Sequence, residues 1–294
     1  LALAGALTRL GKDVLCTVAS SIPPRYSFLD PAGRVVPYQP PGTAYRDRDA
    51  VIVLDTGTWN QLGDFGELMR GMPAAKAVID HHVTQDDLGA TRFVDTSAEA
   101  AGRLAHEAIM ALGNGLAPEE AHALFIALAM DTGWFRHPNT TPATFALASD
   151  LVEAGARPTP AYEELFERSN LGRLKLTALV LGRLELAHGG RTCLMSLKAS
   201  DYAEAGAVPQ DSEDLVNYPR SVAGTEVGLF LMEQPRGGIK ASFRARTLDV
   251  ARIAEQFGGG GHKLASGATL PGPLEEAKRR VLAAVGAALD ALPT

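Results

Sequence analysis

The stretch Ala77-Val78-Ile79-Asp80-His81-His82 places an acid and two imidazoles directly after a short apolar run. The apolar part is typical of a strand buried in a parallel sheet. Open α/β sheets bind their ligands beyond the carboxyl ends of such strands. We therefore expect Asp80, His81 and His82 to lie at a sheet edge and to form the centre of a functional site.

Two other apolar segments also end in an acid. Residues 51–54 are followed by Asp55, and residues 123–130 are followed by Asp131. A single acid in such a position is usually a cap or a satisfied core residue. Three such ends in one chain instead favour a shared site with metal ligands.

Composition limits the classes of protein to which the chain can belong. The 294 residues suffice for two domains, and no apolar run approaches the roughly 18 residues that span a bilayer. The net charge of −6 argues against a protein that coats long duplex DNA, but it allows a local basic pocket for a short strand or a nucleotide. Cys16 and Cys193 are too few and too far apart for a disulfide scaffold or a zinc ribbon, so a reducing cytoplasm fits best.

Strands and helices alternate in the first half of the chain, which is typical of an α/β fold with a doubly wound parallel sheet. Because the chain opens on a helix, without the strand that should feed it, we expect a fragment that begins after its first strand. The predicted elements are a helix at 1–10, strands at 14–18, 51–54 and 77–79, and helices at 62–69, 97–112 (capped by Thr96 or Ser97), 118–130 and 142–155.

The second half of the chain indicates a separate domain. Apolar positions between Tyr162 and Leu184 have helical spacing, and short strand patterns follow them. We expect a parallel-sheet domain over residues 1–160, a linker helix over 161–186 and a smaller mixed α/β domain over 187–294.

The run Gly258-Gly259-Gly260-Gly261-His262 is a second candidate site. Successive glycines let the backbone approach a ligand and offer its amides to an anion. A flexible linker is the plainer interpretation, but a histidine and an Ala-Ser-Gly turn follow the run, which favours a ligand loop. Cations and hydroxyls near predicted strand ends suit phosphate, although a solvated strand face explains any single arginine nearly as well; they are Arg220, Ser221, Ser242, Arg244 and Arg246.

Together these motifs resemble the DHH phosphoesterase superfamily in its DHHA1 subfamily. The resemblance lies in Asp80-His81-His82, with Asp55 before it, Asp131 after it and the Gly-His run in a C-terminal domain. The spacing is similar to that of the short, two-domain members called nano-RNases, over essentially the full chain. The family's first motif, His-x-x-x-Asp-x-Asp, has no counterpart here, so three of the family's metal ligands are missing.

The resemblance implies a role for each matching residue. Two manganese ions would bind at the sheet edge, bridged by Asp55, with His81 and Asp131 as ligands of one ion. His82 would face the scissile phosphate, and Asp80 would orient an imidazole. The C-terminal domain would hold the nucleotide through Arg220, Ser221, Ser242, Arg244, Arg246, Gly260, Gly261 and His262. Oxygen and imidazole donors suit Mn²⁺ or Mg²⁺ independently of the resemblance.

The implied activity is hydrolysis of short RNA or DNA oligonucleotides to mononucleotides, and of 3′-phosphoadenosine 5′-phosphate to AMP, by a cytoplasmic enzyme that forms a homodimer. Three alternatives stay open. The chain could hydrolyse pyrophosphate or polyphosphate, although the Gly-His run favours nucleotides. It could act on dinucleotides derived from cyclic dinucleotides. It could also be a nucleotide-binding module without catalysis, as the missing first motif suggests.

Overall fold

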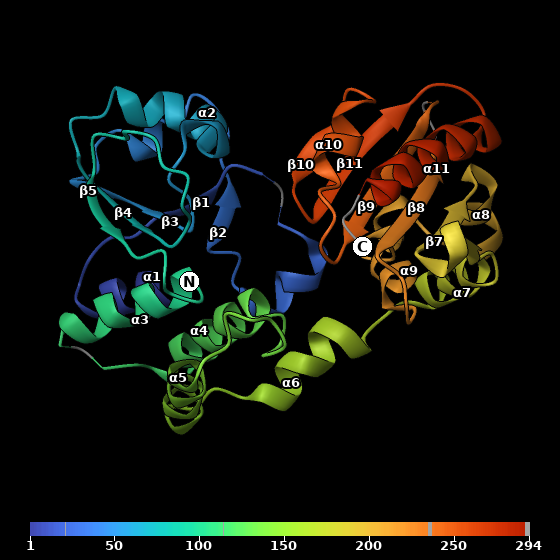
Figure 1. Cartoon of the computed structure of the whole chain (residues 1–294). Coiled ribbons are helices and arrows are strands. Elements are labelled where there is room, and N and C mark those ends of the chain that lie inside the picture. The colour runs from blue at the N-terminus through green and yellow to red at the C-terminus, as the bar shows by residue number, and fades with distance from the viewer. Residues whose placement is uncertain (21, 114, 235–236, 292–294) are drawn as a thin grey trace. The chain divides into compact units, whose positions relative to one another are not determined.

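The computed structural model describes residues 1–20, 22–113, 115–234 and 237–291 (Figure 1). The chain divides into two compact units, Leu1–Arg168 and Ser169–Thr294. In the described residues, no helix combines the length and the apolarity needed to cross a membrane.

The first unit is built from parallel strands and helices. Its strands form a pair, β1–β2, and a three-stranded sheet in the order β3-β4-β5, and every pairing among them is parallel. The described parallel strands thus form two sheets rather than one continuous sheet. The elements are α1 (Ala2–Arg9), β1 (Cys16–Val18), β2 (Val35–Pro37), β3 (Ala50–Leu54), α2 (Trp59–Arg70), β4 (Ala75–Asp80), β5 (Thr91–Val94), α3 (Ala101–Ala111), α4 (Pro118–Asp131), α5 (Pro142–Glu153) and α6 (Pro158–Tyr162).

Helices cover both faces of the β3–β4–β5 sheet. Side chains of a strand alternate between faces, so Val78 and Ile79 of β4 enter different cores. Val78 packs with residues of α2, whereas Ile79 packs with residues of α1, α3 and α4. Figure 1 shows α2 on one side of this sheet and α3 on the other. This arrangement confirms the predicted α/β class with parallel strands.

The segment between β4 and α3 differs from the prediction. Strand β5 was not predicted, and α3 begins at Ala101 with Ala100 as its N-terminal flanking residue, so a cap at Thr96 or Ser97 is wrong. The backbone amide and hydroxyl of Ser97 donate to Asp95 at 2.8 and 2.6 Å. This local turn engages the Ser97 side chain before the helix starts.

The predicted linker helix is also wrong as a single element. After α6, residues Glu163–Glu167 form a π-helical turn, and a new helix, α7 (Leu171–Leu181), starts after a break. Asn170 causes the restart, because its side chain accepts a hydrogen bond from the Arg173 amide at 2.7 Å. The apolar spacing continues across the break, which is why the sequence pattern did not show it.

The second unit holds a six-stranded mixed sheet in the order β10-β11-β9-β8-β7-β6, in which only β7 and β8 pair in parallel. Leu229 and Leu231 of β8 pack with α10 and α11, whereas Phe230 and Met232 pack with α7 and α8. The further elements are β6 (Glu185–Ala187), β7 (Thr192–Leu197), α8 (Ala199–Ala205), α9 (Asn217–Ser221), β8 (Val227–Glu233), β9 (Ile239–Ala245), α10 (Ala251–Glu255), β10 (Gly260–His262), β11 (Ala265–Leu270) and α11 (Leu274–Asp290).

A buried ion pair fixes α8 to the end of α7. The carboxylate of Asp201 is 1% exposed, accepts both terminal nitrogens of Arg183, and accepts the Lys198 amide at 2.7 Å. Burial raises the pKa of Asp201, but the hydrogen bonds from Arg183 and the Lys198 amide outweigh it, so the pKa lies below its usual value. Its stabilising effect is therefore complete above the unfolded-state pKa and disappears as the pH falls through the folded-state pKa.

We expect Asp201→Asn to lower the free energy of unfolding at pH 7 by about 1.5–3 kcal/mol, the usual contribution of hydrogen bonds to a charged group. The difference from the wild type should shrink below about pH 4, where the carboxyl of the unfolded chain takes up a proton. Urea unfolding at pH 7 and pH 3 measures both values. Asp290→Asn, at an exposed acid of α11, is the control. An equal difference at both pH values would contradict this role of Asp201.

Candidate metal centre

Parallel pairing of β3 and β4 brings two of the predicted acids together. Leu54 lies opposite Ile79, and the Asp55 amide donates to the Ile79 carbonyl at 3.0 Å. Asp55 has a φ of 62°, in the left-handed region that aspartate tolerates better than most residues. The chain therefore turns sharply out of β3 at the residue that presents the carboxylate.

Asp80 is fully buried, and hydrogen bonds occupy its carboxylate. Its Oδ1 accepts the amides of His81 and His82 at 2.8 and 3.2 Å and the Nδ1 of His82 at 2.8 Å. Its Oδ2 accepts the side-chain amide of Gln85. Burial raises the pKa of Asp80, but these bonds from His82, Gln85 and the backbone outweigh it and hold the pKa below its ordinary value. Asp80 therefore orients its neighbours as a carboxylate.

His81 faces two acids. Its Nδ1 lies 3.0 Å from the Ala98 carbonyl, which can only accept a hydrogen bond, so Nδ1 carries a proton and Nε2 is the nitrogen left to bind a metal. Nε2 lies 3.5 Å from Asp55 Oδ1 and 3.6 Å from Asp131 Oδ2. Donors that each lie about 2.0–2.2 Å from one ion are roughly 3–3.5 Å apart. The distances from His81 to each of the two acids thus suit a pair of ligands on one divalent cation.

The charges at this edge of the β3–β4–β5 sheet also favour binding of a cation. Burial raises the pKa of Asp55, and the two histidines offset it only in part. Burial and then the charge of Asp55 raise the pKa of Asp131. Donor atoms of Asp55, His81 and His82 all lie within 4.8 Å of one another. A divalent cation would relieve the repulsion between the two carboxylates and favour their ionised forms.

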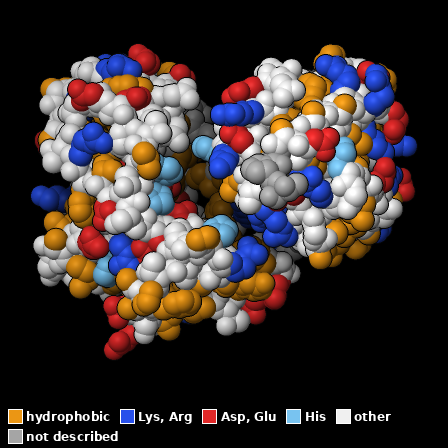
Figure 2. All heavy atoms as spheres, in the orientation of Figure 1, with side chains coloured by type: hydrophobic (Ala, Val, Ile, Leu, Met, Phe, Trp, Pro, Cys, Tyr) orange, Lys and Arg blue, Asp and Glu red, His pale blue; other side chains and the backbone are white. Residues whose placement is uncertain are grey.

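His82 differs from His81 in its hydrogen bonding. Its Nδ1 is committed to Asp80 and lies 3.8 Å from Asp55 Oδ1, and half of its side chain is exposed. The hydrogen bond to Asp80 raises the pKa of His82 more than burial lowers it. The imidazolium form, with a proton on Nε2, is therefore favoured and suits contact with an anion. Figure 2 shows histidine side chains beside acidic ones on the surface of the first unit.

Gln85 and Asp86, which the sequence did not indicate as site residues, connect the loop after β4 to the loop after β3. The Asp86 amide donates to the Gly57 carbonyl at 2.8 Å, and its carboxylate accepts the Trp59 amide at the start of α2 at 2.9 Å. A Cβ at Gly57 would lie 2.0 Å from the end of the Gln85 side chain, so a larger residue there would displace Gln85. No sequence spacing indicates these contacts, because they join residues from two different loops.

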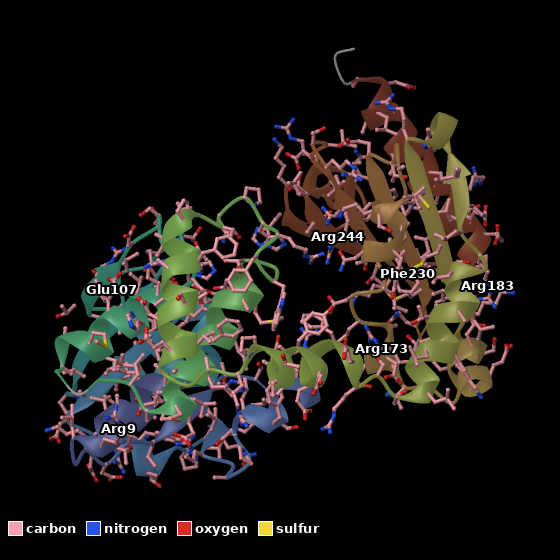
Figure 3. The ribbon with its side chains drawn as sticks, turned by 90° about the horizontal axis from the view of Figure 1, so that it is seen from below. Arg9, Glu107, Arg173, Arg183, Phe230 and Arg244 are labelled. Carbon is pink, nitrogen blue, oxygen red and sulfur yellow. The ribbon has the colours of Figure 1, made fainter. Side chains whose placement is uncertain are left out.

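The predicted nucleotide-binding residues of the second unit fall into two groups. Cross-strand pairing forms one row of Gly260, Gly267 and Ser242, and another of His262, Ala265 and Arg244. Directly paired residues share a sheet face, so Ser242, Arg244, Gly260 and His262 lie on one face. On this face, within the described residues, the hydrophobic core that packs against α7 and α8 contains side chains of β7 and β8. It contains none from β9, β10 or β11. Arg244 extends from β9 (Figure 3).

Arg220 lies close to this face. A Cβ on Gly228, which pairs with Arg244, would lie 2.5 Å from the Arg220 amide, so α9 packs directly over that strand. Burial lowers the pKa of Arg244; Asp214 opposes this effect, and the charge of Arg220 adds to it. These two arginines therefore concentrate positive charge at one end of the paired rows.

The other three predicted residues do not join this group. The Ser221 hydroxyl donates to the Tyr218 carbonyl at 2.7 Å, and Arg246 donates to the carbonyls of Thr225 and Arg220 at 2.8 and 3.3 Å. Gly261 lies between Gly260 and His262 and so faces the other side of the sheet. In this structure Ser221 and Arg246 bond to the backbone near them.

Comparison with known proteins identifies relatives of this chain. Residues 194–291 match the model of the DHHA1 domain. The bifunctional oligoribonuclease and PAP phosphatase NrnA of Thermus thermophilus is 34% identical over 219 residues, which are 73% of this chain and 65% of that protein. The protein of the same name from Bacillus subtilis is 28% identical over 224 residues, 75% of this chain and 69% of that protein. The chain is therefore a relative of these NrnA proteins and carries a DHHA1 domain.

A solved structure supports the same fold. An exopolyphosphatase-related protein from Bacteroides fragilis superimposes with a TM-score of 0.90 at 23% identity, covering 98% of this chain and 88% of that protein. This likeness shows that the chain shares the fold of that protein. The DHHA1 match and the NrnA relatives confirm the resemblance seen in the sequence. The chain spans about two thirds of the length of the NrnA relatives, 65% and 69%.

We expect Asp55→Asn to weaken binding of Mn²⁺ by at least about 100-fold, because a neutral amide replaces a charged ligand, while changes at outer partners already cost 10–100-fold. Titration calorimetry on the full chain measures the dissociation constant. The control is Asp64→Asn, at an exposed acid of α2. Binding as tight as that of the wild type, with an unchanged circular dichroism spectrum, would exclude Asp55 as a ligand.

Proposed function

We propose that the chain is a metal-dependent phosphoesterase that hydrolyses short oligonucleotides to mononucleotides and 3′-phosphoadenosine 5′-phosphate to AMP. The observation that carries this proposal is the convergence of Asp55 and Asp131 on the free nitrogen of His81, with the imidazole of His82 beside them. The names of the NrnA relatives support the class of substrate.

Asp55, His81 and Asp131 would hold the divalent cation, for which we propose Mn²⁺, with Mg²⁺ as the second choice. Such an ion supplies a Lewis acid for phosphoryl oxygens and lowers the pKa of a bound water. The donor set suits one ion. A pair of ions bridged by Asp55 needs more ligands than these three side chains provide.

His82 would bind the scissile phosphate. Asp80 fixes the ring through Nδ1, so Nε2 can donate to a phosphoryl oxygen. The hydrogen bond to Asp80 raises the pKa of His82 and so favours the charged ring, which would stabilise the negative charge that develops on phosphoryl oxygens during hydrolysis. Asp80 acts only through His82 in this scheme, because its oxygens are already occupied.

The second unit would hold the remainder of the nucleotide. Gly260 and Gly267 carry no side chains and so leave a shallow floor on this face of the sheet, and Arg244 and His262 lie in the neighbouring row. The guanidinium of Arg244 and the nearby Arg220 suit a phosphate.

The deciding experiment measures Mn²⁺-dependent hydrolysis of a diribonucleotide, 3′-phosphoadenosine 5′-phosphate and pyrophosphate. It uses residues 1–294 and a form that includes any residues its gene encodes before Leu1. Hydrolysis of the first two substrates by either form supports the proposal. Hydrolysis of pyrophosphate alone would replace it with a pyrophosphatase, and nucleotide binding without any hydrolysis would replace it with a binding module.

We expect His82→Ala to lower kcat/KM for the diribonucleotide by about 10²–10³-fold, the usual effect of removing one stabilising donor, and to leave Mn²⁺ affinity unchanged. Steady-state kinetics and calorimetry test the two halves separately. His106→Ala, on α3, is the control. Loss of Mn²⁺ binding in His82→Ala would show that His82 is a ligand instead.

A further inference from the structure

The side chain of Asn139 joins two segments that support the metal ligands. Its Nδ2 donates to the Glu99 carbonyl at 3.1 Å and to the Asp131 carbonyl at 3.3 Å. A primary amide has two protons, so one group can satisfy both carbonyls. Asn139 itself belongs to neither segment, because it lies in the loop between α4 and α5.

The first segment fixes the ring of His81. The Ala98 carbonyl accepts the His81 Nδ1, and Glu99 follows immediately. The buried Glu99 carboxylate accepts two nitrogens of Arg103 at 2.5 and 2.6 Å, and Arg103 also donates to the Ala143 carbonyl at 3.0 Å. The side chain of Glu99 is thus held by Arg103, and its backbone is held by Asn139.

The second segment is the carboxyl end of α4. The last four carbonyls of a helix lack partners within the helix. Here Leu128, Ala129 and Met130 accept the amides of Thr132, Trp134 and Gly133. The Asp131 carbonyl accepts the Asn139 side chain. Asn139 therefore completes the end of the helix at the residue whose carboxylate faces His81.

The turn after α4 brings Asn139 back to this position. Gly133, Trp134 and Phe135 have φ values of 57°, 60° and 63°, a left-handed turn that residues with side chains adopt only at a cost. The amides of Arg136 and His137 then donate to the Thr132 carbonyl, which closes the turn. Such strain is retained at sites where a function depends on it.

We propose that Asn139 is a positioning residue that sets the distance between His81 Nε2 and the Asp131 carboxylate. It touches neither side chain, and its effect passes through the Ala98–Glu99 backbone and the last turn of α4. The proposal rests on the proposed metal site. Aspartate has the same shape but no donor, so at position 139 it would place acceptors against two carbonyls and separate the segments.

The test compares the wild type, Asn139→Ala and Asn139→Asp in the full chain. Mn²⁺ affinity comes from calorimetry, and kcat and KM are measured at saturating Mn²⁺. Both variants should bind Mn²⁺ about 10–100-fold more weakly than the wild type, as other changes behind metal ligands do. kcat should fall, and KM should stay within about twofold. The control is Asn60→Ala, at an exposed α2 residue whose side chain has no hydrogen bond within the described residues.

Three outcomes would overturn the proposal, and they separate its failure from that of the metal site. Wild-type Mn²⁺ affinity in both variants would overturn the positioning role and leave the metal site intact. A lower melting temperature of the metal-free protein, with Mn²⁺ affinity unchanged, would show a purely structural role. A wild type that binds no Mn²⁺ would overturn the metal site and this inference together.

Discussion

The buried carboxylate of Asp80 is the constraint on which the candidate site depends. A carboxylate with no exposed surface is stable only when its oxygens are hydrogen-bonded, because an unpaired buried charge costs several kcal/mol. Its donors come from the next residues of the chain, His81, His82 and Gln85. The backbone after β4 must therefore curl around the carboxylate, which gives the two histidines fixed and different directions.

That turn gives two neighbouring imidazoles unlike chemistry. His81 is held through its Nδ1 by an uncharged carbonyl, so Nε2 is left to face Asp55 and Asp131. His82 is held through its Nδ1 by a carboxylate, which favours a charged ring. One histidine is suited to a cation and the other to an anion, although both belong to the same three-residue motif.

Much of the fold and the centre of the site could be predicted because their signals are local. The strands that end at Asp55 and Asp80 are apolar runs that stop at an acid, and parallel pairing brings such ends to one sheet edge. The break at Asn170 escaped prediction because apolar spacing continues across it. Asp86 and Asn139 escaped because their partners lie in other segments of the chain. For Arg246 the sequence indicated a phosphate contact, but its guanidinium donates to two backbone carbonyls in this structure.

The first unit gathers acids at its sheet edge, whereas the second unit gathers arginines on one sheet face. This separation explains how a chain of net charge −6 could still bind the anionic substrates of the proposed function. In the first unit, burial raises the pKa values of Asp55 and Asp131, so that edge lacks positive charge until a cation binds. In the second unit, Arg220 and Arg244 gather positive charge beside a floor of glycines, and the charge of Asp214 offsets part of it. In the proposed function, a metal ion would relieve the first imbalance and a phosphate would relieve the second. Charge would therefore favour each of these ligands at its proposed site.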